Sequence, residues 1–475
     1  MLIFAFQVYM ILFQTNQQTK EPEPSKPEIN APNLLLGTTR ESIKNSEVYS
    51  FSIGPYRLSI SKTGARLTSA VYKPYNKELI TEVERKLNIF PLEIIVNDPY
   101  ITSKLSFSPY EIRFQDNKII ASFEESNIKV NKIIWYDGKL LRFKLITEGI
   151  NTPFVVIGAN LKEGELFSHN GSVFKLNKKL QRIDIEDLKS PAVFHGDISM
   201  AGEESRYYFK GFSGDISTIA IYRLGEHTLS AIVPKGELVM HFGAKEYNQL
   251  KAANLTDAID FGRLWFLVKP LFMFLYWTYD KTGFWIVSIF ILTFIVRLLM
   301  FPLTYNSTVA FSKMAELAPK IQELKQKYAK DQAKFQEELI KLYQQAGFNP
   351  ASGCLPIILQ IPIFFALYKV LTITSELQLE RFLWVNSLAE KDPYYILPAL
   401  MGLTMVLQQI ITPNPDRTQN YLMIGMSIVF VLAFAGFPSG LVLYWIFNNI
   451  ISIGQTYLIK KLTQPKPTKK RRKKA

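Results

Sequence analysis

A single arginine, Arg297, lies inside a long apolar run, and its position indicates chemistry more clearly than that of any other residue. The run 284–301 is long enough to cross about 30 Å of hydrocarbon. Thr293 lies one helical turn before Arg297, and Thr304 lies two turns after it. A charge at this depth costs several kcal/mol unless it faces water or a partner. Arg297 is therefore either a binding position inside a membrane or a side chain that reaches back to the headgroups.

A second polar stripe follows the apolar run 440–458. Its side chains recur at helical spacing, with two more beside them: Tyr444, Asn448, Ser452 and Gln455, with Trp445 and Asn449. Gln360, in the run 351–372, lies at a depth like that of Arg297, and no acidic residue lies deep in any run to neutralise the arginine. Two interpretations stay open: hydrogen bonds between helices, or a hydrated cavity open to the cytoplasm that receives something polar or negative.

Motifs for most enzyme classes are missing. The sequence has no GxxxxGK[ST], dinucleotide fingerprint, GxSxG or HExxH, so ATPase, hydrolase and zinc-protease functions have no support. The single cysteine, Cys354, excludes an intrachain disulfide framework and a thiolate zinc site, and the four histidines show no metal-ligand spacing. We expect no catalytic residue, no metal and no cofactor. Carboxylates remote in sequence could still form a pair.

Composition indicates where the membrane lies. The 475 residues have a mean hydropathy of +0.06 and a net charge of +14. Residues 20–258 hold 31 basic and 29 acidic side chains, whereas residues 259–475 hold 24 and 12, so the basic excess accompanies the apolar runs. Five runs predict membrane spans: Phe284–Phe301, Ala351–Thr372, Pro393–Ile411, Tyr421–Phe437 and Gly440–Leu458.

Lys and Arg in the loops predict the orientation. The loop 303–350 has seven, the loop 412–420 has one and the tail 459–475 has nine, against two in the loop 373–392. The positive-inside rule therefore predicts a cytoplasmic C-terminus and places the large domain in the periplasm of a double-membraned bacterium.

These observations predict a polytopic α-helical membrane protein of about six transmembrane helices, with a five-helix core and a large periplasmic β-sandwich. The expected parts are an uncleaved N-terminal anchor (1–14, its start expected upstream), a Pro-rich tether (15–34), the β-sandwich (35–258), an interfacial amphipathic helix (259–280), the second transmembrane helix (281–302), a cytoplasmic helical hairpin (303–350), transmembrane helices three to six (351–458) and a basic cytoplasmic tail (459–475).

The segment 35–258 has the period-two alternation of antiparallel strands. Asp137-Gly138 predicts a type I′ turn between Ile133–Tyr136 and Leu141–Leu145. Phe51–Ile60 and Ile216–Tyr222 also predict strands, and no amphipathic helix is expected before about residue 246. Mostly short strands over this length favour a large sandwich, which could bind sugar or protein.

Four stretches of the second half resemble the signatures of the YidC/Oxa/Alb family of membrane protein insertases. They are Phe294–Arg297, Asn349–Pro356, Asp392–Pro398 and Phe437–Tyr444. The resemblance extends from about residue 259 to 462, and the large outer domain resembles the Gram-negative branch, whose periplasmic domain is a β-supersandwich. It implies that Arg297 is the groove arginine and that Thr293 and Trp445 contact substrate. Lys369 departs from the pattern.

The expected function is to insert inner-membrane proteins and help them fold, through a cytoplasm-open hydrophilic groove. We expect Arg297, Thr293, Gln360, Tyr444, Trp445, Asn448 and Ser452 to line this groove. The resemblance implies nascent membrane proteins and the Sec translocon (SecYEG, SecDF) as partners, with the hairpin docking the ribosome and targeting machinery. The basic tail Lys469–Lys474 would contact membrane lipids or ribosomal RNA.

Two other functions stay open. A secondary transporter could use Arg297 as an anion site, although no internal repeat is visible. A membrane-tethered carbohydrate-binding or carbohydrate-active protein would need carboxylates or histidines that converge in the β domain.

Overall fold

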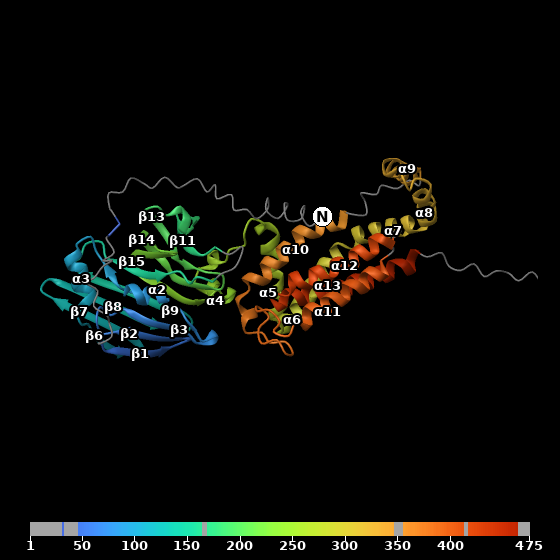
Figure 1. The fold of residues 1–475 in the computed structure, drawn as a ribbon. Coiled ribbons are helices and arrows are strands. Elements are labelled where there is room, and N and C mark those ends of the chain that lie inside the picture. The colour runs from blue at the N-terminus through green and yellow to red at the C-terminus, as the bar shows by residue number, and fades with distance from the viewer. Residues whose placement is uncertain (1–30, 33–45, 164–168, 346–354, 413–416, 464–475) are drawn as a thin grey trace, which may run out of the picture. The chain divides into compact units, whose positions relative to one another are not determined.

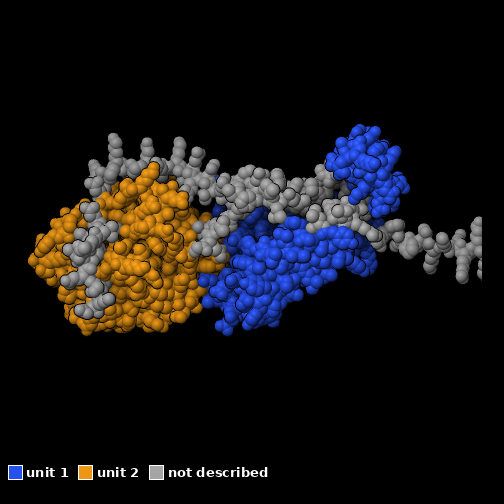
Figure 2. Space-filling model, in the orientation of Figure 1, with its two compact units in different colours: residues 1, 261–372, 376–475 blue, residues 2–260, 373–375 orange. Residues whose placement is uncertain are grey.

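A computed structural model describes residues 31–32, 46–163, 169–345, 355–412 and 417–463. The chain divides into two compact units (Figure 2). We call residues 2–260 with 373–375 the β unit, and residues 261–372 with 376–475 the helical unit. The expected N-terminal anchor, most of the tether, Cys354 and the lysine-rich end of the tail lie outside the described residues.

The β unit is built from antiparallel strands in two sheets (Figure 1). The smaller sheet has the order β1-β2-β3-β4, and the larger has the order β12-β11-β13-β14-β15-β9-β8-β7-β6, with β10 pairing with β15 and β5. The strands are β1 (Val48–Ile53), β2 (Tyr56–Ser61), β3 (Leu67–Tyr72), β4 (Lys77–Glu78), β5 (Ile94–Ile95), β6 (Glu111–Gln115), β7 (Lys118–Glu125), β8 (Ile128–Tyr136), β9 (Leu141–Glu148), β10 (Phe154–Ala159), β11 (Gly171–Leu176), β12 (Lys179–Ile183), β13 (Ala192–Glu204), β14 (Tyr208–Leu224) and β15 (His227–Ala244). The prediction of a large antiparallel β domain is confirmed.

Two details of that prediction are wrong, and one holds for most strands but not for the three longest. The stretch Phe51–Ile60 is two strands, because Gly54 (φ +52°) and Pro55 turn the chain between β1 and β2. The strands β13, β14 and β15 have 13, 17 and 18 residues, so the central strands are long. Asp137-Gly138 does join β8 to β9, but only Gly138 has a positive φ, and a type I′ turn requires two such residues.

Short helices also occur earlier than expected. They are α2 (Glu82–Leu87) and α3 (Pro99–Phe107), ahead of α4 (Tyr247–Ala252). The helix α2 begins with a capping box, in which Thr81 and Glu84 satisfy each other's backbone N–H groups. Asp98 caps α3, and Pro99 occupies its first position. These local signals are visible in the sequence and are independent of apolar periodicity.

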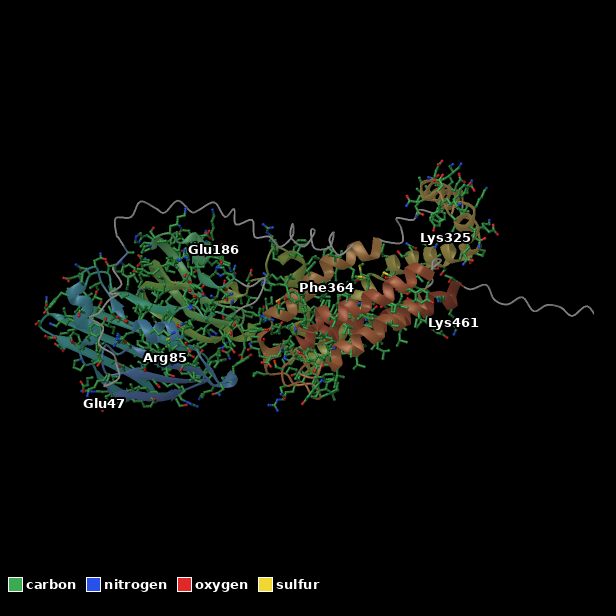
Figure 3. The ribbon with its side chains drawn as sticks, in the orientation of Figure 1. Glu47, Arg85, Glu186, Lys325, Phe364 and Lys461 are labelled. Atoms are coloured by element: carbon green, nitrogen blue, oxygen red, sulfur yellow. The ribbon has the colours of Figure 1, made fainter. Side chains whose placement is uncertain are left out.

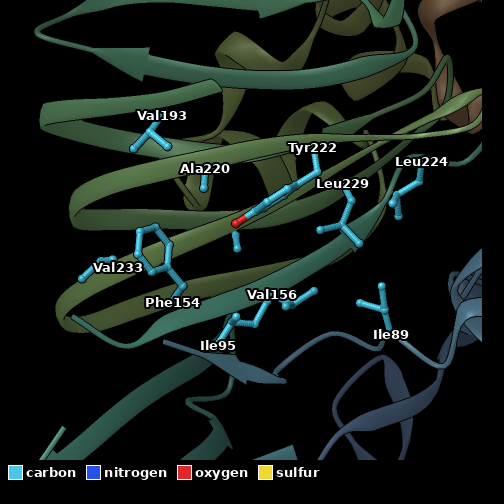
Figure 4. Close-up of a cluster of buried hydrophobic side chains, with 11 residues drawn as sticks. Ile89, Ile95, Phe154, Val156, Val193, Ala220, Tyr222, Leu224, Leu229 and Val233 are labelled. Carbon is cyan, nitrogen blue, oxygen red and sulfur yellow. The ribbon is translucent and has the colours of Figure 1, made fainter. Parts of the chain in front are cut away.

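A cluster of buried apolar side chains forms a core of the β unit (Figure 4). Phe154 and Val156 on β10 pack with Ala220 and Tyr222 on β14 and with Leu229 on β15. β-Branched and aromatic residues suit this position because they fill the space against a pleated surface. The core holds the long strands together and so positions the buried charges described below.

The helical unit contains the apolar runs of the sequence (Figure 1). Its helices are α5 (Trp265–Thr282), α6 (Trp285–Leu299), α7 (Phe301–Glu316), α8 (Ala318–Lys327), α9 (Gln332–Gln345), α10 (Leu355–Ile373), α11 (Ile396–Ile411), α12 (Arg417–Phe434) and α13 (Ser439–Thr463). The helix α13 packs against α6, α7 and α11. Figure 3 shows the charged ends of Lys325, on α8, and Lys461, near the end of α13.

Length and apolarity support one broken membrane span among the described residues. No single described helix meets the criterion alone, but Trp285–Leu299 and Phe301–Ala310 meet it together across a bend of 59°. Pro302 lies at the bend and cannot donate a helical hydrogen bond. Shorter apolar helices cover Gln360–Ile373, Ile396–Ile411 and Met423–Phe434. The number of spans therefore stays a prediction.

Candidate functional site

Arg297 lies in the last turn of α6 and is held by α13. Its Nε donates to Asn448 Oδ1 at 2.7 Å, and its backbone carbonyl accepts from Gln455 Nε2 at 3.1 Å. Within the described part of the chain, no carboxylate forms an ion pair with the guanidinium. An amide oxygen can orient an arginine but leaves its positive charge in place. The site is therefore the positively charged guanidinium of Arg297, a residue that the neutral amides of Asn448 and Gln455 hold in place.

The polar stripe on α13 contacts three helices. Tyr444 Oη accepts from Gln360 Nε2 on α10 at 3.3 Å, Asn448 contacts α6, and Ser452 Oγ accepts from Gln408 Nε2 on α11 at 2.9 Å. A helix advances about 100° per residue, so positions four apart drift by about 40° each time. From Tyr444 to Ser452 this drift is about 80°, which turns Ser452 away from the arginine and toward α11.

Two further predicted residues occupy separate surroundings. Thr293 is buried, and its hydroxyl donates to the backbone carbonyl of Ile289 at 2.6 Å within the same helix. Trp445 packs among aromatic rings, with centroids 5.1 Å from Phe364 and 5.1 Å from Phe434. The structure thus brings together Arg297, Asn448 and Gln455, with the hydrogen-bonded pair Gln360 and Tyr444 beside them. Thr293, Trp445 and Ser452 have no described hydrogen bond to either group.

A second polar contact between α11 and α13 was not expected from the sequence. Asn449 Nδ2 donates to Thr404 Oγ1 at 2.9 Å, one turn from the contact between Gln408 and Ser452. We call these four residues the α11–α13 seam. Thr404 and Gln408 are four residues apart in an otherwise apolar run, and this spacing was a signal that could have identified them.

Convergent charges do occur in the β unit, around the buried carboxylate of Glu204. Its Oε1 lies 2.6 Å from Arg182 Nε and 2.8 Å from His169 Nδ1, and its Oε2 lies 2.8 Å from Lys245 Nζ. Burial alone would raise the pKa of Glu204, but these three cations hold it well below its usual value. The carboxylate is neutralised inside the fold. No group of three or more metal-ligating side chains occurs in the described residues.

His169 is the histidine of this cluster, and its ring contacts two carboxylates. Its Nε2 also contacts Asp184 Oδ1 at 3.2 Å. Burial lowers the pKa of His169, but contacts with the carboxylates of Asp184 and Glu204 outweigh this effect and raise the pKa to about 9. The imidazole is therefore charged at neutral pH and forms part of a buried ion network.

Known proteins show what the chain is similar to. The family described as "60Kd inner membrane protein" matches residues 277–467, and the family described as "YidC periplasmic domain" matches residues 234–274. The membrane protein insertase YidC of Aquifex aeolicus (strain VF5) is 45% identical over 466 residues, which cover 96% of this chain and 92% of that protein. This chain belongs to the YidC family of membrane protein insertases.

A second relative is also a membrane protein insertase YidC. YidC of Wolinella succinogenes is 34% identical over 439 residues, covering 86% of this chain and 81% of that protein. A crystal structure titled as an active YidC insertase with the first transmembrane domain resolved has a TM-score of 0.45 and 21% identity, covering 88% of this chain and 95% of that chain. The YidC family consists of inner-membrane proteins with a periplasmic domain. Membership decides against the transporter and carbohydrate-active alternatives.

Proposed function

We propose that this membrane protein insertase uses the polar site between α6, α10 and α13 as a hydrophilic groove, through which it inserts membrane proteins and helps them fold. The observation that carries the proposal is the environment of Arg297, whose Nε contacts the neutral amide of Asn448 while no described carboxylate pairs with it. Such a cation can attract an acidic segment without first breaking an ion pair. Gln360, Tyr444 and Asn448 add hydrogen-bonding groups beside it.

The proposed mechanism is thermodynamic and needs no covalent step. Moving a hydrophilic tail across a bilayer is opposed by desolvation of its backbone and charges. A polar groove that opens to the cytoplasm shortens the apolar path, and Arg297 offers a transient partner to acids in the tail. The apolar helix of the substrate meanwhile partitions into lipid beside the bundle, and this partitioning drives insertion.

Thr293, Trp445 and Ser452 belong to the proposal in different roles. Thr293 is on the same helix as Arg297, one turn away, and would contact the substrate backbone once its own bond to Ile289 is exchanged. Trp445 would contact the apolar part of the substrate through its aromatic neighbours. We assign Ser452 to the α11–α13 seam, since its described bond is to Gln408.

Topology and partners complete the proposal. We propose about six spans, a periplasmic β unit with a sandwich-like arrangement and a cytoplasmic C-terminus, on the basis of the lysine and arginine distribution. The helices α8 and α9 would form the cytoplasmic hairpin, on which Lys325 and Lys341 are exposed. Anionic surfaces such as ribosomal RNA or lipid headgroups fit this charge. The Sec translocon is a proposed partner on the basis of family resemblance alone.

Two substitutions at one position test the groove. Arg297→Ala should slow the insertion of a client with an acidic tail about tenfold more than that of the same client with a neutral tail, whereas Arg297→Lys should retain most of the activity because charge matters more than fork geometry. Pulse-labelled insertion, normalised to the amount of folded variant, measures both. Equal defects for the two clients would contradict the proposed role of the charge.

A further inference from the structure

The loop between α10 and α11 carries apolar side chains on an unusual backbone. Leu383 is 75% exposed and has a φ of +51°, and Tyr395 is 50% exposed with a φ of +58°. A side chain at positive φ strains the backbone, and Asn, Asp and Gly tolerate that region best. Other exposed residues of the described chain at positive φ include Asn117, Ser126 and Asn177, all polar. A leucine and a tyrosine are unfavourable at these positions for two reasons: the backbone has a positive φ, and the apolar side chains are exposed to solvent.

This loop is rigidly built beneath its exposed side chains. The buried carboxylate of Asp392 accepts from Trp384 Nε1 at 2.9 Å and from the backbone N–H groups of Tyr394 and Leu397 at 3.0 and 2.7 Å. The Leu388 carbonyl accepts from the N–H of Gly440, at the start of α13, at 2.8 Å. The fold therefore holds the exposed residues in place rather than leaving them free to turn inward.

The loop is also joined to the helix expected at the membrane interface. Tyr276 Oη, on α5, donates to Glu376 Oε2 at 2.6 Å. The same helix exposes Trp265, Phe266 and Trp277, which are 61%, 56% and 56% exposed. Tryptophan and tyrosine gather at headgroup depth because their rings are apolar and their N–H or O–H groups are wet.

From this arrangement we propose that residues 379–395 form a lipid-binding loop, which inserts Leu379, Leu383, Tyr394 and Tyr395 into the headgroup region of the outer leaflet. Leu379 is 51% and Tyr394 is 67% exposed, and the exposed cations Arg381 and Lys391 suit lipid phosphates beside them. A lipid surface is the occupant that fits, because the loop joins two apolar helices whose ends lie at that surface. The inference rests on the proposed membrane embedding.

Depth-resolved quenching tests the inference in the full chain. In a Cys354→Ala background, an environment-sensitive dye is attached at Leu383→Cys, at Val429→Cys on the exposed face of α12, or at Lys139→Cys in the β8–β9 turn. The protein is reconstituted in phosphatidylethanolamine and phosphatidylglycerol vesicles that carry nitroxides at shallow or deep acyl positions. We expect shallow nitroxides to quench the Leu383 dye at least twofold more than the Lys139 dye, and deep nitroxides to quench the Val429 dye.

The possible outcomes distinguish the proposed lipid-binding loop from the proposed membrane embedding on which it rests. Quenching at Val429 without quenching at Leu383 would overturn the lipid-binding loop and leave the membrane embedding intact. Quenching at neither position would overturn both. The dye at Leu383→Cys could instead become shielded from water as the protein density in the vesicles rises, without any dependence on nitroxide lipid. That result would assign the surface to a second copy of the chain and would also overturn the inference.

A second variant excludes a merely structural role for Leu383. Leu383→Asn suits the positive φ, so the melting temperature in detergent should stay unchanged or rise. In vesicles, the same substitution should reduce the shallow quenching of a dye at Leu379→Cys by at least twofold. A melting temperature that falls by several degrees would show that Leu383 is part of the folded core and would contradict the proposal.

Discussion

At the scale of single residues, the partner of Arg297 decides what the site can do. A carboxylate partner would neutralise the arginine, whereas Asn448 orients it through one hydrogen bond of 2.7 Å and leaves the charge in place. In the proposed groove, a client acid would therefore compete with a neutral acceptor and not with a resident ion. The sequence predicted both residues, because each lies in an apolar run, but it could not show that they bond to each other across 151 positions.

Asn448→Asp tests this interpretation directly. The new carboxylate would lie within hydrogen-bond distance of Arg297 Nε and would neutralise it, so folding should be preserved while insertion of acidic-tailed clients falls about tenfold. Neutral-tailed clients should be inserted nearly as before. Insertion rates of the two clients, measured beside the melting temperature of the variant, provide the test. Undiminished insertion of the acidic client would mean that the arginine charge is not used.

His169 makes a prediction about pH in the β unit. Its pKa is raised to about 9 in the folded state, against about 6.5 unfolded, so the charged form stabilises the fold. This contribution is fully present below about pH 6.5 and is lost as the pH rises through 9, at most about 3 kcal/mol in all.

Hydrogen exchange of peptides from β13 should report this loss. Between pH 7 and 10, protection corrected for intrinsic exchange rates should fall in the wild-type chain. It should change little over the same range in His169→Gln, which lacks the titrating group. Parallel curves for the two proteins would argue against His169 as the source.

At the scale of elements, α13 organises the helical unit because its polar side chains contact three different helices. The apolar runs predicted the positions of the helices, because the length and hydropathy of a run can be read directly from the sequence. The spacing of Tyr444, Asn448 and Ser452 predicted one face, but drift along the helix separates Ser452 from the other two. Strand ends were missed where a turn residue was overlooked, as at Gly54, which separates β1 from β2.

The α11–α13 seam should stabilise without taking part in insertion. Ser452→Ala would leave Gln408 Nε2 without its acceptor and should destabilise the bundle by about 1 kcal/mol. The double variant Gln408→Leu, Ser452→Ala removes both groups and should recover most of that loss. Thermal unfolding in detergent measures the stability, and client insertion should stay within twofold of wild type throughout. A charge-dependent insertion defect in either variant would return Ser452 to the groove.

At the scale of the whole molecule, the orientation in the membrane is predicted from the distribution of lysine and arginine and not from contacts between residues. The two units are joined at about residue 260, and the basic excess of the chain belongs to the helical one. An antiparallel β domain was predictable from alternation and turn residues. Buried ion clusters such as that of Glu204 were not, because their members are as remote in sequence as His169 and Lys245.

Reporter fusions test the orientation. Alkaline phosphatase folds to an active enzyme only after export, so a fusion at Glu376 should be active and one at Lys330 inactive. Comparing activity per amount of fusion protein removes differences in expression. The reverse pattern would place the β unit on the cytoplasmic side and would overturn the proposed topology.

The double attachment of Arg297 to α13 has a consequence for how a client could be admitted. The side-chain bond to Asn448 and the backbone bond to Gln455 join the same two helices but serve different atoms of one residue. A client carboxylate competes only for the guanidinium, so the amide of Asn448 can be displaced while the carbonyl of Arg297 stays bonded. We therefore expect charge exchange and helix separation to be independent events, with the Gln455 bond still joining α6 and α13 while successive acids bind and leave.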